Sequence, residues 1–348
     1  MEIRSKRTQP SSLESDVQND GQFIFKQFKY YNDVPTTISH WQLRSLIASP
    51  KNNTIIHPIR DSIFSFNTKT EQDSKLISGL PFEPTAIDTN FGYLALAGRY
   101  GGALIKDLSG EWQKSFNTGS GMNNSIHLSQ HGSNDIRLTV CNNDESVLVY
   151  DVPNMHNIVS LKMSSAANYA SVSPDGRKMV CVDDSGESHL YSISSHRYEK
   201  IASYKVSRDP CASCAWNSSS DIFATTSQDG HITAWDIQNG KEPIFRVNST
   251  EKRRSKKAAR AIQFSKGPLD LLAYTEHVSI VNILDMRTFD KRQIVSLKPF
   301  GSGPHPHIAG LAFSPNNKSL YVGLENSIAE LYVNTSERRR FSSYSHCL

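Results

Sequence analysis

A set of short strand-like segments recurs seven times along this 348-residue chain, and the repeat restricts the possible folds more than any other feature. In the clearest unit, the runs 211–216 and 222–227 are each short enough for a β-strand, and an Asp-Gly turn at Asp229 and Gly230 precedes a third run, 231–237. Trp235 has an equivalent in every unit, and the equivalent positions are Phe64, Lys106, Tyr150, Tyr191, Trp235, Leu284 and Tyr332. Successive members of this series lie 41 to 49 residues apart, a period that indicates an array of small sheets.

The repeat predicts an all-β fold, a single seven-bladed β-propeller. One four-stranded sheet cannot bury both of its faces alone, so such sheets stack around a ring in which each covers its neighbours. We therefore expect four-stranded antiparallel blades over residues 21–345. Residues 1–20 are polar and charged, and we expect them to form a disordered N-terminal tail.

A propeller ring is complete only when a strand from one end of the chain joins the last blade. An unpaired edge strand would otherwise favour aggregation. Residues 22–31 alternate apolar and polar side chains ahead of the first blade, and we expect this segment to close the ring. The C-terminal segment 341–344 is the competing choice.

The third run of the fifth unit points to a known family. Residues 227–237 read Ser-Gln-Asp-Gly-His-Ile-Thr-Ala-Trp-Asp-Ile, which resembles the signature of the WD-repeat (WD40) β-propeller family. The resemblance implies structural roles for Asp229 and Trp235, in a buried hydrogen-bond network to which Thr225 or Ser227 contributes. Only this unit keeps the Trp-Asp pair, so we expect the other blades to be held by packing alone.

The whole chain resembles poorly characterised fungal WD-repeat proteins that share a C-terminal propeller segment. Some of those proteins are implicated as substrate receptors of the GID ubiquitin ligase and recognise the N-terminus of a target. The resemblance implies a non-enzymatic protein-interaction scaffold, or a substrate-recruiting subunit of a larger complex such as a ubiquitin ligase.

Composition and charge restrict the partners. A formal net charge of +4 is small for this length and by itself favours neither nucleic acid nor a membrane. No segment resembles a signal peptide, and no apolar run approaches the roughly 18 residues of a membrane span, so we expect no membrane partner. Five scattered cysteines without a secretory signal indicate reduced thiols and a cytoplasmic or nuclear location.

No motif in the chain predicts catalysis. There is no Ser/His/Asp arrangement, general-acid pair or cofactor fingerprint, so we expect no enzyme, no catalytic residues, no cofactor and no small-molecule substrate. Cys211 and Cys214 have the spacing of half a zinc site, but no second pair follows, and residues three apart on a strand point to opposite faces. His305 and His307 have no carboxylate or thiol nearby in the sequence, so we expect no metal site.

In this family the turns between second and third strands and the connections between blades share one end of the ring, usually the binding face. We call this end the top face. Its turns are rich in acidic residues, a charge that favours a cationic peptide or a free protein N-terminus. The alternative is that aspartate favours turns because its side chain bonds the turn backbone. The expected partner-binding residues are Arg60, Asp61, Arg99, Tyr100, Asp144, Glu145, Asp183, Asp184, Glu187, Glu276 and Glu325.

One dense basic run, 251–260, lies between the fifth and sixth units. It is open to three interpretations: a solvated loop, a nuclear-import or nucleic-acid patch, or a protein-docking loop. The run contains no aromatic side chain to stack on bases, so nucleic acid is the less favoured partner. A nuclear chromatin- or nucleic-acid-associated protein is the alternative function. The basic-loop residues are Lys252, Arg253, Arg254, Lys256 and Lys257.

Overall fold

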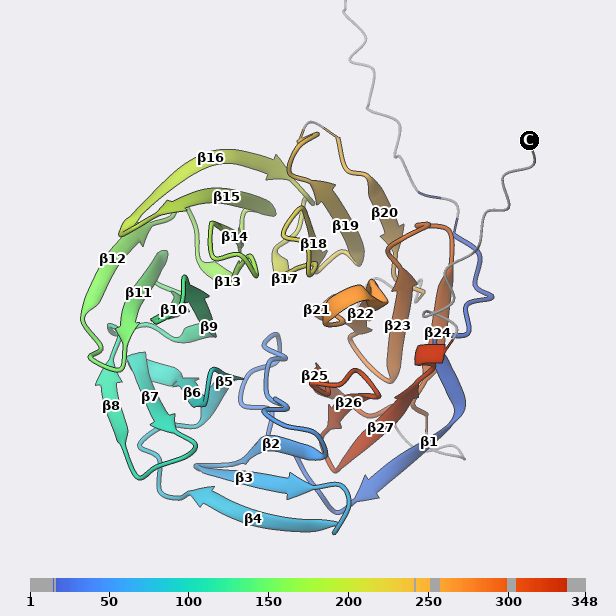
Figure 1. Ribbon diagram of the computed structural model, residues 1–348, viewed down its shortest axis with the longest axis horizontal. Coiled ribbons are helices and arrows are strands. Elements are labelled where there is room, and N and C mark those ends of the chain that lie inside the picture. Colours follow the sequence, from blue (N-terminus) through green and yellow to red (C-terminus); the bar gives the residue numbers. More distant parts are fainter. Residues whose placement is uncertain (1–14, 16, 241, 251–256, 299–304, 337–348) are drawn as a thin grey trace, which may run out of the picture.

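Seven antiparallel β-sheets follow one another around a central axis and form a closed ring (Figure 1). The computed structural model describes residues 15, 17–240, 242–250, 257–298 and 305–336. Each sheet is a blade whose strands run in order from the axis outwards. The predicted all-β, seven-bladed propeller is therefore confirmed.

The blades are numbered in chain order, and their strands are given from the innermost to the outermost. Blade one contains β2 (Thr54–Ile59), β3 (Ser62–Asn67) and β4 (Gln72–Ile77). Blade two contains β5 (Pro84–Asn90), β6 (Tyr93–Gly98), the short helix η1 (Arg99–Gly101), β7 (Gly102–Asp107) and β8 (Gln113–Asn117). Blade three contains β9 (Asn123–His131), β10 (Asp135–Asn142), β11 (Ser146–Val152) and β12 (Asn157–Lys162). Blade four contains β13 (Ala167–Val172), β14 (Lys178–Asp183), β15 (Glu187–Ser194) and β16 (Arg197–Lys205).

The remaining blades have the same order. Blade five contains β17 (Cys211–Trp216), β18 (Ile222–Ser227), β19 (His231–Asp236) and β20 (Phe245–Asn248). Blade six contains β21 (Ala259–Phe264), the short helix η2 (Gly267–Leu269), β22 (Leu271–Glu276), β23 (Ile280–Asp285) and β24 (Arg292–Ser296). Blade seven contains β25 (Ile308–Phe313), β26 (Ser319–Leu324), β27 (Ser327–Val333) and β1 (Ile24–Asn32).

The equivalents of Trp235 occupy the same place in every blade. All seven lie on the strand next to the outermost one, which is β3, β7, β11, β15, β19, β23 or β27. The spacing of these seven positions in the sequence is therefore the number of residues from one blade to the next.

Blade one differs from the expected four strands, because its sheet contains three. The innermost place is taken by residues around Ala48, whose N–H and carbonyl oxygen both pair with Ile56. The preceding residues bond to other blades: Leu46 N–H donates to Ala309 of blade seven, and Ser45 accepts from Ile87 of blade two. This segment divides its backbone hydrogen bonds among three blades, so it does not form a regular strand.

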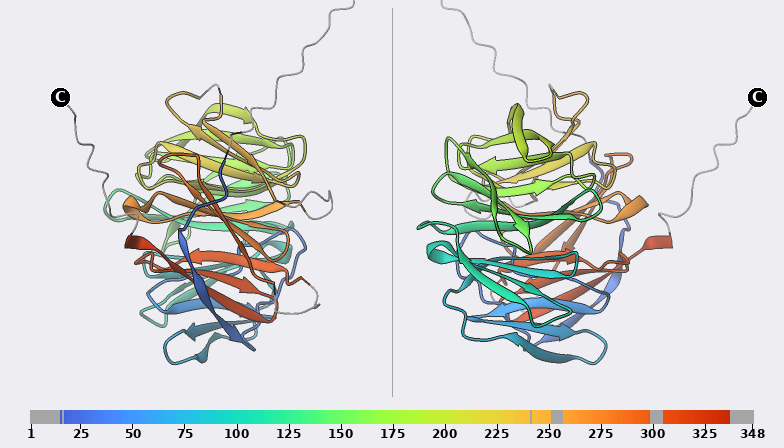
Figure 2. Two further views of the ribbon diagram at one scale, coloured as in Figure 1. Left: turned by 90° about the vertical axis from the view of Figure 1, so that its right-hand side faces the viewer. Right: turned by 60° about the vertical axis from the view of Figure 1, so that its left-hand side comes forward.

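The N-terminal strand β1 closes the ring by pairing antiparallel with β27. Figure 1 shows it outside blade seven, and the side views in Figure 2 show it (blue) beside the red strands of that blade. The hydroxyl of Tyr31 donates to a carboxylate oxygen of Glu330, 2.6 Å away, and both side chains are buried. The predicted closure by residues 22–31 is confirmed, and the competing segment 341–344 lies outside the described residues.

The apolar core is divided among the interfaces between neighbouring blades. Between blades four and five, Val180 and Leu190 share one buried cluster with Phe223 and Trp235. The rings of Phe223 and Trp235 stack with their centroids 5.2 Å apart. Each blade thus covers the apolar face of the next, which provides the main driving force for the ring.

Part of the predicted N-terminal tail follows the outer edge of the ring. Ser15 N–H donates to the carbonyl oxygen of Arg246, and Gln18 forms a parallel bridge with Lys291. Residues 1–14 and 16 lie outside the described residues. The disorder expected for residues 1–20 remains a prediction for those positions.

Replacing Tyr31 with phenylalanine tests the closing strand. We expect Tyr31→Phe to lower the free energy of unfolding by about 1–3 kcal/mol, because the buried Glu330 carboxylate loses a donor. Tyr30→Phe on the same strand is the matched control, since the buried Tyr30 hydroxyl has no hydrogen-bond partner among the described residues. Thermal denaturation of both variants should show a lower Tm for Tyr31→Phe alone. Equal shifts in the two variants would contradict this role.

Candidate functional site

The top face is built by the alternation of strand direction. Since neighbouring strands are antiparallel, second-to-third-strand turns and blade-to-blade connections lie at the same end of the ring. The seven predicted turns do join second and third strands. They connect β2 to β3, β6 to β7, β10 to β11, β14 to β15, β18 to β19, β22 to β23 and β26 to β27.

Two members of the predicted acidic set do not reach the surface. Asp183 is 0% exposed and Glu276 is 1% exposed. Each is the last residue of the second strand of its blade, and each accepts hydrogen bonds from inside that blade. The structure therefore removes both residues from the expected partner-binding surface and gives them structural roles.

Asp183 is the centre of a hydrogen-bond network in blade four. It lies 3.0 Å from Nε2 of His189, whose Nδ1 lies 2.9 Å from the hydroxyl of Ser203. The hydroxyl of Ser185 donates to the same carboxylate across the turn. Burial alone would raise the pKa of Asp183, but the hydrogen bonds from His189 and Ser185 outweigh it and hold the pKa at about 2. Asp183 is therefore a charged group that stabilises the fold.

Glu276 plays the corresponding part in blade six. Its carboxylate accepts from Nδ2 of Asn282 at 2.9 Å, and from the N–H and hydroxyl of Thr250 at 2.7 and 2.8 Å. Thr250 follows blade five, so this contact also joins two blades. The expectation that blades other than the fifth are held by packing alone is wrong for blades four and six.

In blade five, the two residues expected to be structural are Asp229 and Trp235. The first forms hydrogen bonds, and the second packs in the core. Asp229 accepts a hydrogen bond from the hydroxyl of Ser227 at 2.5 Å. The hydroxyl of Thr225 donates instead to the carbonyl oxygen of Thr233. Trp235 is 2% exposed and acts through its stacking on Phe223. The network around Asp229 thus consists of Ser227, Ser207 and His231, whose Nε2 lies 3.6 Å from the carboxylate, and Trp235 contributes by packing.

The other expected partner-binding residues remain accessible to different degrees. Glu145 and Glu187 are half-buried, and Glu145 pairs with Lys162 at 3.0 Å. Asp184 accepts from Asn168 at 2.8 Å. The exposed members are Arg60, Asp61, Arg99, Tyr100, Asp144, Asp184 and Glu325.

The basic loop contributes one described residue. Lys257 is half-buried immediately before β21. Lys252, Arg253, Arg254 and Lys256 lie outside the described residues, so their predicted role stays a prediction.

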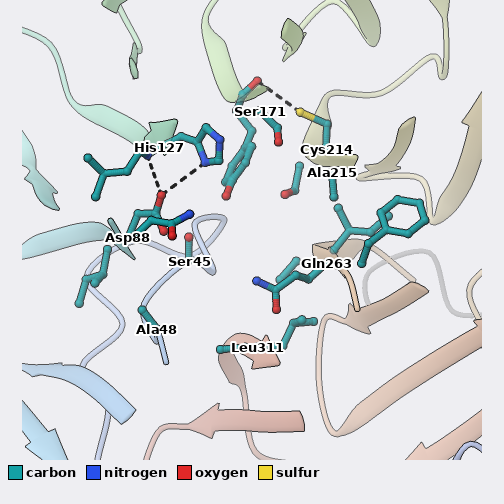
Figure 3. Close-up of a pocket in the computed structure, with 18 of the residues that line it drawn as sticks. Ser45, Ala48, Asp88, His127, Ser171, Cys214, Ala215, Gln263 and Leu311 are labelled. Atoms are coloured by element: carbon teal, nitrogen blue, oxygen red, sulfur yellow. Dashed lines mark hydrogen bonds and ion pairs between the residues drawn. The ribbon is translucent and has the colours of Figure 1, made fainter. Parts of the chain in front are cut away.

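A cavity of about 460 Å³ lies on the axis of the ring and is lined by residues 42–45 and 47–49 and by the innermost strands of blades two to seven. In the close-up of this cavity, Asp88 and His127 point toward each other, with a carboxylate oxygen 3.4 Å from Nδ1 (Figure 3). Asp88 also accepts from Leu128 N–H at 2.7 Å. Ser171, Cys214 and Gln263 come from other blades around the same space (Figure 3).

The connection from β1 to blade one crosses the top face. Hydrogen bonds fix it to the turns of blades seven, one and two. Thr36 N–H donates to the carbonyl oxygen of Glu325 in blade seven, and the Thr37 hydroxyl accepts from Arg60 N–H in blade one. The guanidinium of Arg99 donates to the carbonyl oxygen of Ser39. Arg99, expected to contact a partner, therefore also supports this connection.

This connection brings together a set of residues that we call the channel mouth: His40, Trp41, Arg44, Arg99 and Arg260. The guanidinium of Arg260 lies over the ring of Trp41, 5.4 Å from its centroid, although Trp41 is 59% exposed. Burial lowers the pKa of His40, and Arg99, Arg44 and Arg260 lower it further. Only Arg99 of this set was expected, because the sequence shows neither where the connection runs nor which strand start faces it.

The described residues contain no group of three or more His, Cys, Asp and Glu side chains that could hold a metal ion. Cys211 and Cys214 were expected on opposite faces of a strand, but both lie in one buried cluster between blades four and five. An irregularity in the pairing between Cys211 and Ser213 shifts the alternation. Burial raises the pKa of both thiols, so both are neutral at pH 7. No helix in the described part of the chain is long and apolar enough to cross a membrane.

Fold and site together define a seven-bladed β-propeller whose top face carries the channel mouth. A chain in the crystal structure of a mitotic checkpoint complex matches it with a TM-score of 0.72. The match covers 94% of this chain and 99% of that chain at 12% sequence identity, and it shows the shared fold.

The sequence is similar to fungal proteins and to one family model. Residues 257–296, which include all of blade six, match an uncharacterised protein domain, DUF2415. Uncharacterized protein C4G3.03 of Schizosaccharomyces pombe is 26% identical over 318 residues, which are 88% of this chain and 91% of that protein. Uncharacterized protein YLR149C of Saccharomyces cerevisiae is 28% identical over 217 residues, 52% of this chain and 30% of that protein. The expected resemblance to fungal proteins is confirmed.

The low pKa of Asp183 makes a prediction about acid stability. Because that pKa lies near 2, below the ordinary value, the charged form stabilises the fold above roughly pH 4, and this stabilisation is lost as the pH falls through about 2. We expect Asp183→Asn to lower the free energy of unfolding by about 2 kcal/mol near pH 7.

The comparison is a urea-unfolding series between pH 7 and pH 3, with Asp184→Asn, the exposed neighbour, as the control. The difference between Asp183→Asn and the unmodified protein should shrink as the pH falls. A difference that is constant with pH would rule out the charged Asp183 as its source.

Proposed function

We propose that this protein is a non-enzymatic interaction platform that recruits a protein partner to a larger complex through the channel mouth. The observation that carries the proposal is a pair of large exposed aromatic side chains on the top face, Trp41 at 59% and Tyr100 at 80% exposure. Exposed aromatic residues held on a rigid frame are typical of the centres of protein interfaces. The chain of similar fold comes from a crystal structure of a mitotic checkpoint complex, which supports a role with protein partners.

Both aromatic residues lie on anchored backbone. Tyr100 lies in η1, and the N–H of the next residue, Gly101, donates to the carbonyl oxygen of Gly121, while its own carbonyl oxygen accepts from Thr118 N–H. Trp41 is in the connection that Arg99 bonds at Ser39. A partner would therefore meet a surface that is already ordered, which lowers the entropic cost of binding.

A finer proposal follows from the resemblance to fungal WD-repeat proteins: the platform is a substrate receptor of a ubiquitin ligase that binds a cationic peptide or a free N-terminus. With Asp183 and Glu276 buried, its support comes from the exposed Asp61, Asp184 and Glu325 and from Asp88 in the cavity. The alternative of a nuclear protein that binds nucleic acid through residues 252–257 stays a prediction, as does a cytoplasmic or nuclear location.

The platform role is tested by quantitative affinity purification of the full chain from its own cells. We expect Trp41→Ala/Tyr100→Ala to lose its main co-purifying proteins, because the contact centre is removed. Trp112→Ala is the matched control, since Trp112 is 38% exposed in the β7–β8 turn at the opposite end of the ring. Retention of all partners by the double variant, or their loss from Trp112→Ala, would contradict the proposal.

Amine capture has a separate test with synthetic peptides that begin with a free or an acetylated N-terminus. If carboxylates of the top face or cavity bind the amine, peptides with a free terminus should bind about tenfold more tightly, because acetylation removes the charge. Fluorescence anisotropy measures both. Equal affinities would rule out amine capture and leave the platform role standing.

A further inference from the structure

Two arginines at the channel mouth are almost completely shielded from solvent. Arg44 is 6% exposed and Arg260 is 3% exposed. Arg44 lies where the connection from β1 reaches blade one, and Arg260 is the second residue of β21. Both line the central cavity, so their side chains border the same space.

Within the part of the chain that the structure describes, neither guanidinium has an acidic partner at ion-pair distance. Among the described residues, the arginine ion pairs are Arg137 with Asp135 and Arg287 with Asp270. Arg44 donates from Nη1 to the carbonyl oxygens of His40 and Leu43 at 2.7 and 2.9 Å, and its Nε is buried without a partner.

Compared with Arg44, the guanidinium of Arg260 has fewer hydrogen-bond acceptors among the described residues. Its Nε is buried without a partner, and no described residue accepts a hydrogen bond from its guanidinium. The guanidinium lies over the ring of Trp41. Guanidinium groups are seldom buried unless paired, so this side chain indicates a missing acceptor.

The electrostatics of the cluster agree with this geometry. Burial lowers the pKa of Arg260 to about 9, and the positive charge of Arg44 adds to the effect. Burial lowers the pKa of Arg44 to about 10, against the attraction of the exposed Glu325. Both side chains stay charged at pH 7 at a cost to the fold.

We infer that the channel mouth is a receptor for an oxyanion, a phosphate or carboxylate group on a peptide segment of the protein partner. The inference rests on the proposed platform function and names the chemistry of its ligand. Guanidinium groups present paired N–H donors that match the oxygens of phosphate and carboxylate. One such group between Arg44 and Arg260 would accept their free donors and offset both charges.

The surroundings favour a peptide over a free ion. Trp41 covers one side of Arg260 and exposes the rest of its ring, so residues beside the oxyanion have an apolar surface to pack on. A cavity of about 460 Å³ admits one or two side chains and excludes a folded domain. The partner's anionic side chain would therefore enter the cavity while its backbone crosses the top face.

The test uses the full chain and degenerate peptide libraries with serine, phosphoserine, glutamate or lysine fixed at the centre. We expect the phosphoserine and glutamate libraries to bind and the serine and lysine libraries not to bind. Inorganic phosphate should compete with the phosphoserine library. Binding of inorganic phosphate without binding of either anionic library would overturn the inference, as would preferential binding of the lysine library.

The variants are Arg260→Gln and, as matched control, Arg177→Gln, an exposed residue of the β13–β14 turn that lies at the end of the ring opposite the top face and does not line the cavity. Arg260→Gln should weaken binding of the phosphoserine library by about tenfold or more, because a charged bidentate donor is lost. Its Tm should not fall, because the removed charge forms no ion pair with any described residue and its Nε is buried without a hydrogen bond. Unchanged affinity, or a Tm loss with no affinity loss, would contradict the inference.

The two proposals fail separately. If Trp41→Ala/Tyr100→Ala loses its partners and Arg260→Gln binds the anionic libraries normally, the platform stands and the oxyanion receptor is wrong. The opposite result is that Arg260→Gln no longer binds the anionic libraries while Trp41→Ala/Tyr100→Ala keeps every co-purifying protein. In that case the oxyanion site is supported, and the channel mouth is not the surface on which the protein partner docks.

Discussion

The pairing of β1 with β27 is the constraint on which the rest of the structure depends. It joins residues near the two ends of the described chain, as the hydrogen bond from Tyr31 to Glu330 illustrates. Because β1 is the outermost strand of blade seven and the next segment is the innermost part of blade one, the chain must cross the top face between them. The closure of the ring therefore places Trp41 and Arg44 over its axis.

Hydrogen bonds between neighbouring blades hold the innermost strands in register around this axis. The Thr85 hydroxyl donates to the carbonyl oxygen of Asn123 at 2.6 Å. Asn124 donates to Ala167 at 2.9 Å, and Asn168 to Cys211 at 2.8 Å, so three successive blades use the same device. Each bond joins the start of one innermost strand to the start of the next. These contacts make the rim of the cavity a rigid frame, as a preformed binding surface requires.

The repeat was predictable from the sequence because the Trp235 equivalents mark one strand per blade, and blade length varies little. The burial of Asp183 and Glu276 was not predicted, since an acidic residue before a turn is also typical of an exposed turn. A signal was present: both residues lie eight positions before a Trp235 equivalent, and their partners His189 and Asn282 lie two positions before it. A polar pair repeated at those positions indicates an internal network.

The channel mouth could not be predicted in the same way. Arg44 and Arg260 are more than 200 positions apart, and Arg260 reads as the last residue of the basic run 251–260. Only the path of the connection from β1, together with the start of β21, brings them to one cavity. The centre of the predicted top face carries buried positive charge, where the sequence predicted an acidic surface.

Site-specific photo-crosslinking would measure directly where a partner binds. A photoreactive phenylalanine analogue at position 100 or position 112 probes opposite ends of the same blade. If the channel mouth is the docking surface, irradiation in cells should link the partner to position 100 and not to position 112. Crosslinks from position 112 alone would contradict the account.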